Sequence, residues 1–264
     1  MTRREIEGWS LRWDEERAQA ARREGWWRDE TLADLVPRLA AAEPDRLMLV
    51  EGEVRLSAGE LHERALRLGT WLGERVAPGG VVSFMLPNWH EAATIYLAAT
   101  YAGLVANPIL PSLRTRDTAF ILRDCKSRVV FVPETFRRFD YAAMLTGIAA
   151  EMEHGPEIVV VRGTGSVAGT QDYAAILEAS APRTIRHPDP DAVRMVMYTS
   201  GTTGRPKGVL HTHNSLGALL HQIGAYWHVA PGDRFLVASP ISHIGGSIYA
   251  FEGPVLLGSV AVLL

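Results

Sequence analysis

Residues 193–208 read Val-Arg-Met-Val-Met-Tyr-Thr-Ser-Gly-Thr-Thr-Gly-Arg-Pro-Lys-Gly, and this stretch decides how the rest of the chain is interpreted. Its first part, Val193–Tyr198, is an apolar run with the length and composition of a buried strand. The part that follows holds four hydroxyl side chains, three glycines and two cations. Hydroxyls and glycine amides can converge on one oxyanion, and a lysine adds positive charge. The stretch therefore predicts a strand followed by a loop that holds a polyphosphate.

This loop differs from the common P-loop, in which Gly-Lys is followed by Ser or Thr and the lysine opens a helix. Here Pro206 precedes Lys207 and Gly208 follows it. Because a proline disfavours helix at the residue before it, no helix can begin at Arg205. The sequence therefore indicates a phosphate loop of another type, and a plain Gly/Thr-rich surface linker is the less favoured alternative.

Short apolar runs alternate with helical patterns on both sides of this stretch, which predicts an α/β fold. We expect layered, mostly parallel sheets with helices on both faces. The expected strands are 47–51, 54–56, 81–86, 128–132, 157–162, 193–198, 235–239 and 259–264. The expected helices are 11–24, 57–75, 91–101, 115–124, 139–153, 173–179, 215–227 and 244–257.

We divide the 264 residues into four segments. They are a charged, Trp-rich helical segment (1–30), a first α/β subdomain (31–182), a proline-containing linker (183–192) and the start of a second α/β subdomain (193–264). The apolar run 259–264 has no turn or polar tail after it, so we expect the second subdomain to be truncated.

Composition narrows the class of protein. The net charge of −3 gives no reason to expect nucleic acid as a partner, and no uncharged run is long enough to span a bilayer. A single cysteine, Cys125, excludes an internal disulfide framework and suits a reducing cytoplasm. The chain contains only two lysines, Lys126 and Lys207, and one of them lies in the predicted phosphate loop.

The motif Tyr-Thr-Ser-Gly-Thr-Thr-Gly-x-Pro-Lys-Gly at 198–208 resembles the signature of the adenylate-forming superfamily, which includes acyl-CoA synthetases and peptide-synthetase adenylation domains. Other segments share the resemblance: 56–61, 107–114 with 120–122 and 126–130, and Ser-Pro-Ile-Ser-His-Ile-Gly-Gly at 239–246. Within the superfamily, segments 25–32, 86–89 and 139–143 look most like bacterial acid–CoA ligases of the medium-chain or cyclohexanecarboxylate type.

The resemblance implies ATP, Mg²⁺ and CoA as cofactors and co-substrates, and a small carboxylic acid as substrate. The acid would attack the α-phosphorus of ATP, and the CoA thiol would then displace AMP from the acyl-adenylate. Carried over by position, the residues that would hold the β- and γ-phosphates are Thr199, Ser200, Gly201, Thr202, Thr203, Gly204 and Lys207. His243 would lie where the acyl and adenylate sites meet, and Gly245 and Gly246 would let the acyl group approach the backbone.

The family's adenine-stacking block, its ribose-binding Asp, its hinge and its C-terminal domain have no counterpart in 1–264. We therefore expect a fragment that completes neither half-reaction alone. Two alternatives stay open: an aryl-acid adenylating enzyme that loads a carrier protein, and a non-catalytic remnant that only binds nucleotide. The identity of the acid, the acceptor and the oligomeric state are not readable from the residues.

Three further patterns are interpreted as structural. The glycines of 163–169 are spaced one residue too widely for a dinucleotide fingerprint and predict a loop. His211 and His213 lack a third metal ligand and are expected at a strand end that leads into an Asn214/Ser215 helix cap. Cys125 is expected to be buried.

Overall fold

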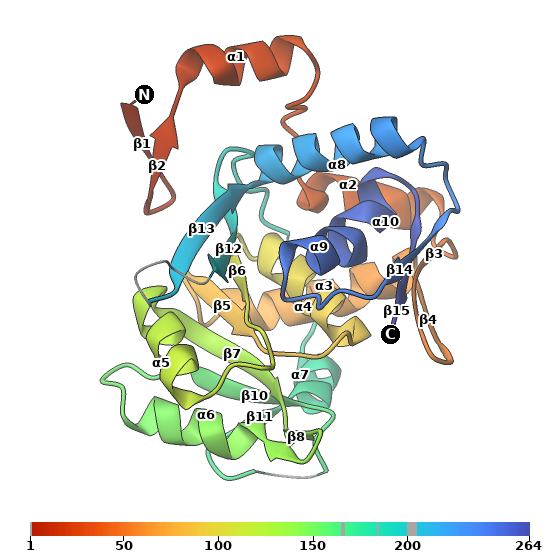
Figure 1. The fold of residues 1–264 in the computed structure, drawn as a ribbon. Coiled ribbons are helices and arrows are strands. Elements are labelled where there is room, and N and C mark those ends of the chain that lie inside the picture. The colour runs from red at the N-terminus through yellow and green to blue at the C-terminus, as the bar shows by residue number, and fades with distance from the viewer. Residues whose placement is uncertain (1, 165–166, 184, 200–204) are drawn as a thin grey trace.

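The computed structural model describes residues 2–164, 167–183, 185–199 and 205–264 (Figure 1). Its helices are α1 Glu15–Arg23, α2 Leu32–Ala42, α3 Ala58–Gly73, α4 His90–Tyr101, α5 Thr115–Asp124, α6 Tyr141–Ala150, α7 Tyr173–Ala179, α8 His213–Trp227, α9 Ile244–Ser247 and α10 Gly253–Leu256, with a π-helical turn η1 Ile248–Glu252. Its strands are β1 Thr2–Ile6, β2 Trp9–Trp13, β3 Leu47–Glu51, β4 Val54–Ser57, β5 Val81–Phe84, β6 Val105–Pro108, β7 Ser127–Pro133, β8 Thr135–Phe136, β9 Phe139–Asp140, β10 Glu157–Val161, β11 Gln171–Asp172, β12 Val193–Thr199, β13 Lys207–Thr212, β14 Arg234–Val237 and β15 Val260–Leu263.

A seven-stranded sheet forms the centre of the fold, in the order β11-β10-β7-β5-β6-β12-β13. Every neighbouring pair is parallel except β12 and β13, which are antiparallel. A second sheet, β14-β15-β3-β4, is parallel apart from its β3–β4 pair. The expected α/β class with mostly parallel sheets is confirmed.

The two faces of the central sheet belong to two separate hydrophobic clusters, as the period of two in a strand requires. Met195 and Met197 of β12 pack in a cluster with α3, α4 and the second sheet. Val196 packs in the other cluster, with α5 and α6, and Val193 joins it because the register of β12 shifts between Val193 and Met195. Helices thus cover both faces, and α3 with α4 fills the space between the two sheets (Figure 1).

The N-terminal segment was expected to be helical over 11–24, but a β-hairpin, β1–β2, occupies 2–13 and α1 begins at Glu15. The hairpin forms because its two turn residues, Glu7 and Gly8, both have positive φ (49° and 83°), the geometry that matches the twist of paired strands. Asp14 caps α1 by accepting a hydrogen bond from the backbone N–H of Arg17.

Several other elements differ from expectation. Helix α2 and strands β6, β8, β9, β11 and β13 were not predicted, and the expected helix 244–257 is divided into α9, the π-helical turn and α10. Gly253 and Pro254 start α10 at that division, where a proline lacks the N–H that a continuous helix would use. The boundary at 183–192 stays a prediction, but the sheets do not follow it, because each large sheet takes strands from both sides of it.

Candidate functional site

The predicted phosphate loop joins two adjacent antiparallel strands. β12 ends at Thr199 and β13 begins at Lys207, and these two residues are paired across the ladder, as are Tyr198 and Gly208. Five of the residues assigned to phosphate binding lie outside the described residues: Ser200, Gly201, Thr202, Thr203 and Gly204. Thr199 and Lys207 are both exposed, and Lys207 forms no ion pair within the described ranges.

The loop leaves the sheet at the carboxyl ends of parallel strands, which is where open α/β sheets bind ligands. β12 runs parallel to β6 and, through it, to β5. Because side chains alternate along a strand, Thr199 shares a face with Met195 and Met197. Lys207 is its cross-strand partner and belongs to the same face. That face packs on the cluster containing the second sheet.

His243 lies on the exit from that second sheet. It is the N-cap of α9, it is exposed, and its Nδ1 accepts a hydrogen bond from the backbone N–H of Gly245 at 3.3 Å. Because Nδ1 acts as the acceptor, the neutral imidazole carries its proton on Nε2. The predicted trio His243, Gly245 and Gly246 is therefore brought together. Within the described ranges no hydrogen bond or ion pair joins it directly to Thr199 or Lys207.

Gly246 has a packing reason to lack a side chain. A Cβ atom there would lie 2.2 Å from the carbonyl oxygen of Pro240, which no structure tolerates. A Cβ at Gly245 would lie 3.6 Å from its nearest neighbour, His243 Nδ1, an ordinary contact. The role of both glycines toward an acyl group stays a prediction.

Asn88 is a residue of this region that the sequence interpretation missed. Its side-chain amide donates to the carbonyls of Val237 (2.9 Å) and Ser239 (3.1 Å), and its carbonyl accepts from the N–H of Ile241 (2.9 Å). Asn88 follows β5 of the central sheet, whereas 237–241 follows β14 of the second sheet. It therefore ties together the exits of both sheets. Its position directly after an apolar strand was the available signal.

Three aromatic rings are stacked on one another, and one of them, Tyr249, lies on the π-helical turn that directly follows α9. Phe235 and Tyr249 are stacked with centroids 5.1 Å apart and planes at 6°, and Trp227 stacks on both at 6.2 Å and 5.9 Å. Trp227 remains 52% exposed, although it is the largest apolar side chain type. The stack is an accessible apolar wall beside the helix that His243 caps.

One cluster of the described residues has the composition of a metal site: Glu51, His90 and Glu91. An arginine already occupies it. Arg162 donates to both carboxyl oxygens of Glu91 at 2.7 Å and to Glu51 at 2.8 Å. Burial opposes ionisation of Glu51, but hydrogen bonds from His90 and Arg162 outweigh it and lower the pKa of Glu51 to about 2. The cluster is an ion-pair network between β3, α4 and the end of β10.

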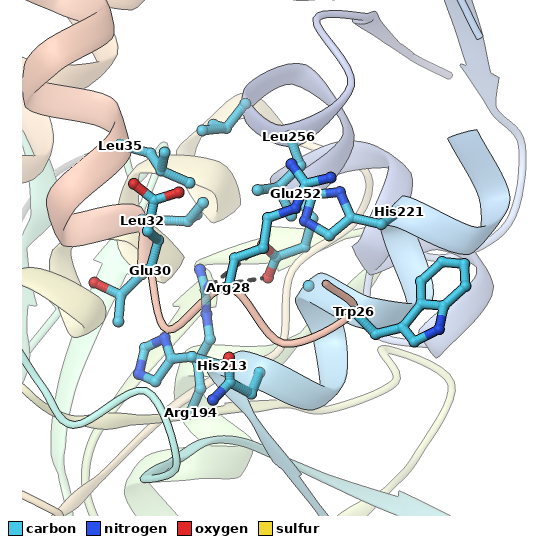
Figure 2. Close-up of a pocket in the computed structure, with 14 residues that line it drawn as sticks. Trp26, Arg28, Glu30, Leu32, Leu35, Arg194, His213, His221, Glu252 and Leu256 are labelled. Atoms are coloured by element: carbon cyan, nitrogen blue, oxygen red, sulfur yellow. Dashed lines mark hydrogen bonds and ion pairs between the residues drawn. The ribbon is translucent and has the colours of Figure 1, made fainter. Parts of the chain in front are cut away.

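A cavity of about 100 Å³ is bounded by the segment 26–35, α8 and α10, and its lining side chains are drawn in Figure 2. Arg194 of β12 lines it and pairs with Glu252 at 3.2 Å, and both side chains are almost fully buried. The hydroxyl of Tyr96 donates to Glu252 at 2.7 Å, and the guanidinium of Arg194 lies over the Tyr96 ring. None of the predicted site residues lines this cavity, so it is separate from the candidate site.

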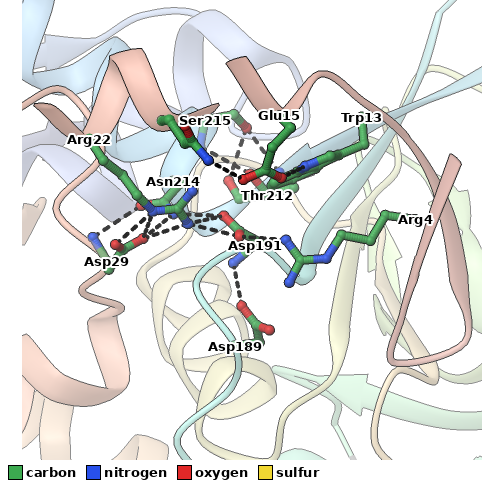
Figure 3. Close-up of polar contacts among 11 residues, drawn as sticks. Arg4, Trp13, Glu15, Arg22, Asp29, Asp189, Asp191, Thr212, Asn214 and Ser215 are labelled. Atoms are coloured by element: carbon green, nitrogen blue, oxygen red, sulfur yellow. Dashed lines mark hydrogen bonds and ion pairs between the residues drawn. The ribbon is translucent and has the colours of Figure 1, made fainter. Parts of the chain in front are cut away.

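Asp191 anchors the N-terminal segment to the body of the protein (Figure 3). It accepts hydrogen bonds from Arg4 (3.2 Å), Arg22 (2.8 Å) and Asn214 (2.9 Å), and its side chain is 4% exposed. Asn214 was expected to cap α8, but Thr212 does so, with Ser215 as its capping-box partner. Asn214 is free to bond Asp191 because the cap is provided two residues earlier.

The interpretations of His213 and Cys125 can now be compared with the structure, whereas part of the loop expected at 163–169 lies outside the described residues. His213 is buried in the first turn of α8 and takes part in no metal-like cluster within the described residues. Burial lowers the pKa of His213, and Arg194 lowers it further. Cys125 is buried as expected, and burial raises the pKa of its thiol to about 12.

A sequence profile described as "AMP-binding enzyme" matches residues 36–264. The chain belongs to the AMP-binding enzyme family. Curated relatives include the medium-chain fatty-acid–CoA ligase of Escherichia coli K12, which is 29% identical over 97% of this chain and 46% of the relative. The sulfoacetate–CoA ligase of Cupriavidus necator is 31% identical over 89% of this chain and 45% of the relative. The chain thus spans less than half the length of these relatives.

Solved structures of AMP-binding enzymes share the fold. Apo MbtA of Mycobacterium smegmatis superposes with a TM-score of 0.85 at 24% identity, over 96% of this chain and 47% of that one. The acetoacetyl-CoA synthetase of Streptomyces lividans gives a TM-score of 0.79 at 25% identity, over 88% of this chain and 38% of that one. No helix of the described residues is long and apolar enough to cross a membrane.

The range that matches the AMP-binding enzyme family includes both parts of the candidate site. The matched range includes the β12–β13 hairpin with its loop and the segment from Asn88 to His243. It leaves out the hairpin β1–β2 and helix α1, which lie before residue 36. The loop and the His243 segment therefore belong to the part of the chain that the family shares.

Proposed function

We propose that this chain forms the phosphate-holding part of an enzyme that activates a carboxylic acid with ATP and passes the acyl group to CoA. An oxygen of the carboxylate attacks the α-phosphorus and the bond to the β-phosphate oxygen breaks, so acyl-AMP and pyrophosphate form. The sulfur of CoA then attacks the acyl carbon, and AMP leaves as the thioester forms. The names of the relatives, which are acid–CoA ligases, support this reaction class.

The observation that carries the proposal is the pairing of Thr199 with Lys207 at the carboxyl end of the central sheet. It sets one hydroxyl and one ammonium side by side at the mouth of the loop, on the face that packs toward the His243 segment. Charge neutralisation of the leaving pyrophosphate is most of what a protein supplies in this chemistry. We assign Lys207 that role, with the hydroxyls of 199–203 as hydrogen-bond donors.

We propose that Mg²⁺ arrives bound to the phosphates of ATP. Magnesium keeps most of its water ligands and is commonly held by substrate phosphates with one or two carboxylates. Among the described residues, the candidate metal cluster is filled by Arg162 and lies on other elements than the loop. We assign Trp227, Phe235 and Tyr249 to one wall of the acid's pocket, because they are accessible and lie beside the helix that His243 caps.

The chain supplies its own control for a test of the phosphate site, since it has only two lysines. ATP affinity is measured by calorimetry for Lys207→Met and Lys126→Met. Both lysines are exposed, so neither substitution alters the core. We expect Lys207→Met to weaken ATP binding about tenfold or more, the cost of one charge-assisted contact, and Lys126→Met to leave it unchanged. Equal effects would contradict the assignment of Lys207.

The acceptor and the acid are tested together. Pyrophosphate exchange is followed with a panel of aliphatic and aromatic acids, and products are then compared with CoA and with a phosphopantetheinylated carrier protein. Thioester formation on CoA supports the ligase, and transfer to the carrier supports the adenylating alternative. ATP binding without exchange for any acid supports a nucleotide-binding role for these 264 residues. We also propose a reducing cytoplasm as the location, supported by the single, buried thiol of Cys125.

A further inference from the structure

The first and last residues of the motif 198–208 are in contact. Tyr198 and Gly208 are directly paired across the β12–β13 ladder. A Cβ atom on Gly208 would lie 3.4 Å from Cζ of Tyr198 and 3.1 Å from Cγ2 of Val196. The phenol ring therefore lies against the bare backbone of Gly208, where a Cβ atom would be in ordinary contact with the ring and would crowd Val196. This packing explains why the motif has a glycine at position 208, independently of phosphate binding.

The far end of the Tyr198 ring is fixed to another element. Its hydroxyl donates to Oδ2 of Asp124 at 2.6 Å. Asp124 is the last residue of α5, where a carboxylate meets the negative end of the helix dipole and gains nothing from it. The hydrogen bond to Tyr198 offsets that unfavourable position. Its length is that of a strong hydroxyl–carboxylate bond.

Tyr198 stays a donor at any physiological pH. Burial raises the pKa of its hydroxyl, and the neighbouring carboxylate of Asp124 raises it further. The contact thus joins the helix α5, the strand β12 and the start of β13 through one side chain. In the same sheet, the buried side chains of Asn107 (β6), Ser83 (β5) and Ser127 (β7) are hydrogen-bonded to one another. This network makes the neighbouring strands rigid.

We propose that Tyr198, seated on Gly208 and held by Asp124, is a positioning residue that fixes the register at the base of the phosphate loop. Thr199 follows Tyr198 in the chain, and Lys207 precedes Gly208. A slip of one residue at this base would turn Thr199 and Lys207 to opposite faces of the sheet. The Tyr198–Asp124 bond opposes that slip. This proposal rests on the proposed function, because a fixed register matters for binding only if Thr199 and Lys207 hold the phosphates of ATP.

The two lysines allow a test that needs no nucleotide. A protease that cuts only after lysine can cleave the native chain at Lys126 and at Lys207. Cleavage after Lys207 requires the β12–β13 base to open, so its rate reports the population of the open form. Tyr198→Phe keeps the ring and removes the hydroxyl. Tyr226→Phe, at a tyrosine that is 82% exposed, is the matched control.

We expect Tyr198→Phe to speed cleavage after Lys207 about tenfold relative to Tyr226→Phe, the worth of one such hydrogen bond. Asp124→Asn keeps an acceptor without the charge and should give a smaller increase. Gly208→Ala should act in the same direction as Tyr198→Phe. Cleavage after Lys207 that is no faster in Tyr198→Phe than in Tyr226→Phe would overturn the proposal.

ATP affinity, measured on the same variants, shows whether Tyr198 positions Thr199 and Lys207 for binding or only stabilises the β12–β13 hairpin. We expect Tyr198→Phe to weaken ATP binding about tenfold while the melting temperature stays within a few degrees of the unsubstituted chain. Faster cleavage with unchanged ATP affinity would show that Tyr198 only stabilises the hairpin, and would overturn its positioning role. Failure of the unsubstituted chain to bind ATP would overturn the proposed function, while the cleavage rates would still report on the hydrogen bond.

Discussion

The side-chain carbonyl of Asn88 accepts a hydrogen bond from the backbone N–H of Ile241 at 2.9 Å, although the two residues are on the exits of different sheets. The amide of the same side chain donates to two carbonyls of the second exit. The uncharged side chain of Asn88 therefore fixes the segment after β5 of the central sheet against the segment after β14 of the second sheet. His243 is two residues beyond this contact and inherits its position from it.

Asn88→Asp should loosen the segment before His243. The carboxylate cannot donate, so it would face the carbonyls of Val237 and Ser239 with like partial charge. We expect a loss of about 1–3 kcal/mol in the free energy of unfolding. Hydrogen exchange at the amide of Ile241 should become faster, because its acceptor is displaced. Unchanged protection of that amide would show that the contact does not hold the segment.

Gly246→Ala and Gly245→Ala form a matched pair one residue apart. The first places a Cβ atom 2.2 Å from the carbonyl oxygen of Pro240, whereas the second meets nothing closer than 3.6 Å. We expect Gly246→Ala to lower the free energy of unfolding by about 1–3 kcal/mol, as overpacking does, and Gly245→Ala to be neutral or slightly stabilising in its helix. Thermal unfolding measures both. If both variants melt alike, the close approach at Gly246 is not present in solution.

The Glu51–Arg162 network should make stability fall in acid. Glu51 has a pKa of about 2 in the folded protein against its ordinary value of 4.5. A depressed pKa contributes stability that is complete above the unfolded value and is lost as pH falls toward the folded one. The contribution should therefore fade between about pH 4.5 and about pH 2. In Glu51→Gln this part of the pH dependence should be absent, as followed by denaturant unfolding at each pH.

The same cluster predicts the outcome of adding metal. Because Arg162 already neutralises Glu51 and Glu91, a divalent cation would have to displace it. We expect Zn²⁺ to leave the melting temperature unchanged in the unsubstituted chain. In Arg162→Ala the two carboxylates and His90 are left facing one another, so Zn²⁺ should raise the melting temperature of that variant. Stabilisation of the unsubstituted chain by Zn²⁺ would show that the arginine does not fill the site.

Glu252→Gln should be among the most destabilising single changes, because it leaves the buried charge of Arg194 without its partner. Breaking a buried ion pair from one side costs about 3–5 kcal/mol. Tyr96→Phe removes only the hydroxyl that Glu252 accepts from, and should cost about 1–3 kcal/mol. Denaturant unfolding of the two variants, with Tyr226→Phe as the exposed control, checks the order of effects.

Local sequence signals predicted most of the fold. Helix α3 begins where the helix 57–75 was expected, with Ser57 and Glu60 as its capping box, and α5 and α7 have the expected bounds. β13 was missed because its residues, from Lys207 to Thr212, are mixed in polarity and at most half-buried. Such an edge strand is specified by its partner β12, and a window of sequence does not contain that partner.

The roles given to Lys207 and His243 from the sequence stay predictions, and the sequence did not point to the residues that hold their segments in place. Lys207 and His243 carry reactive groups that a motif can display. Asn88, Asp124 and Asp191 act through partners that are far away in the sequence: Asn88 is 153 positions from Ile241, and Asp124 is 74 from Tyr198. No spacing rule reaches that distance. These residues became visible only when the two sheets were brought together.

The interleaving of strands also has a consequence for synthesis on the ribosome. β3 pairs directly with β15, and the residues that meet, Leu49 and Ala261, are made about 210 positions apart. At 5–20 residues per second, β3 waits on the order of ten to forty seconds for its neighbour. During that time the backbone N–H and C=O groups of β3 that pair with β15 have no partner strand. Nascent chains of this protein should therefore need a chaperone until the last strand of the second sheet emerges.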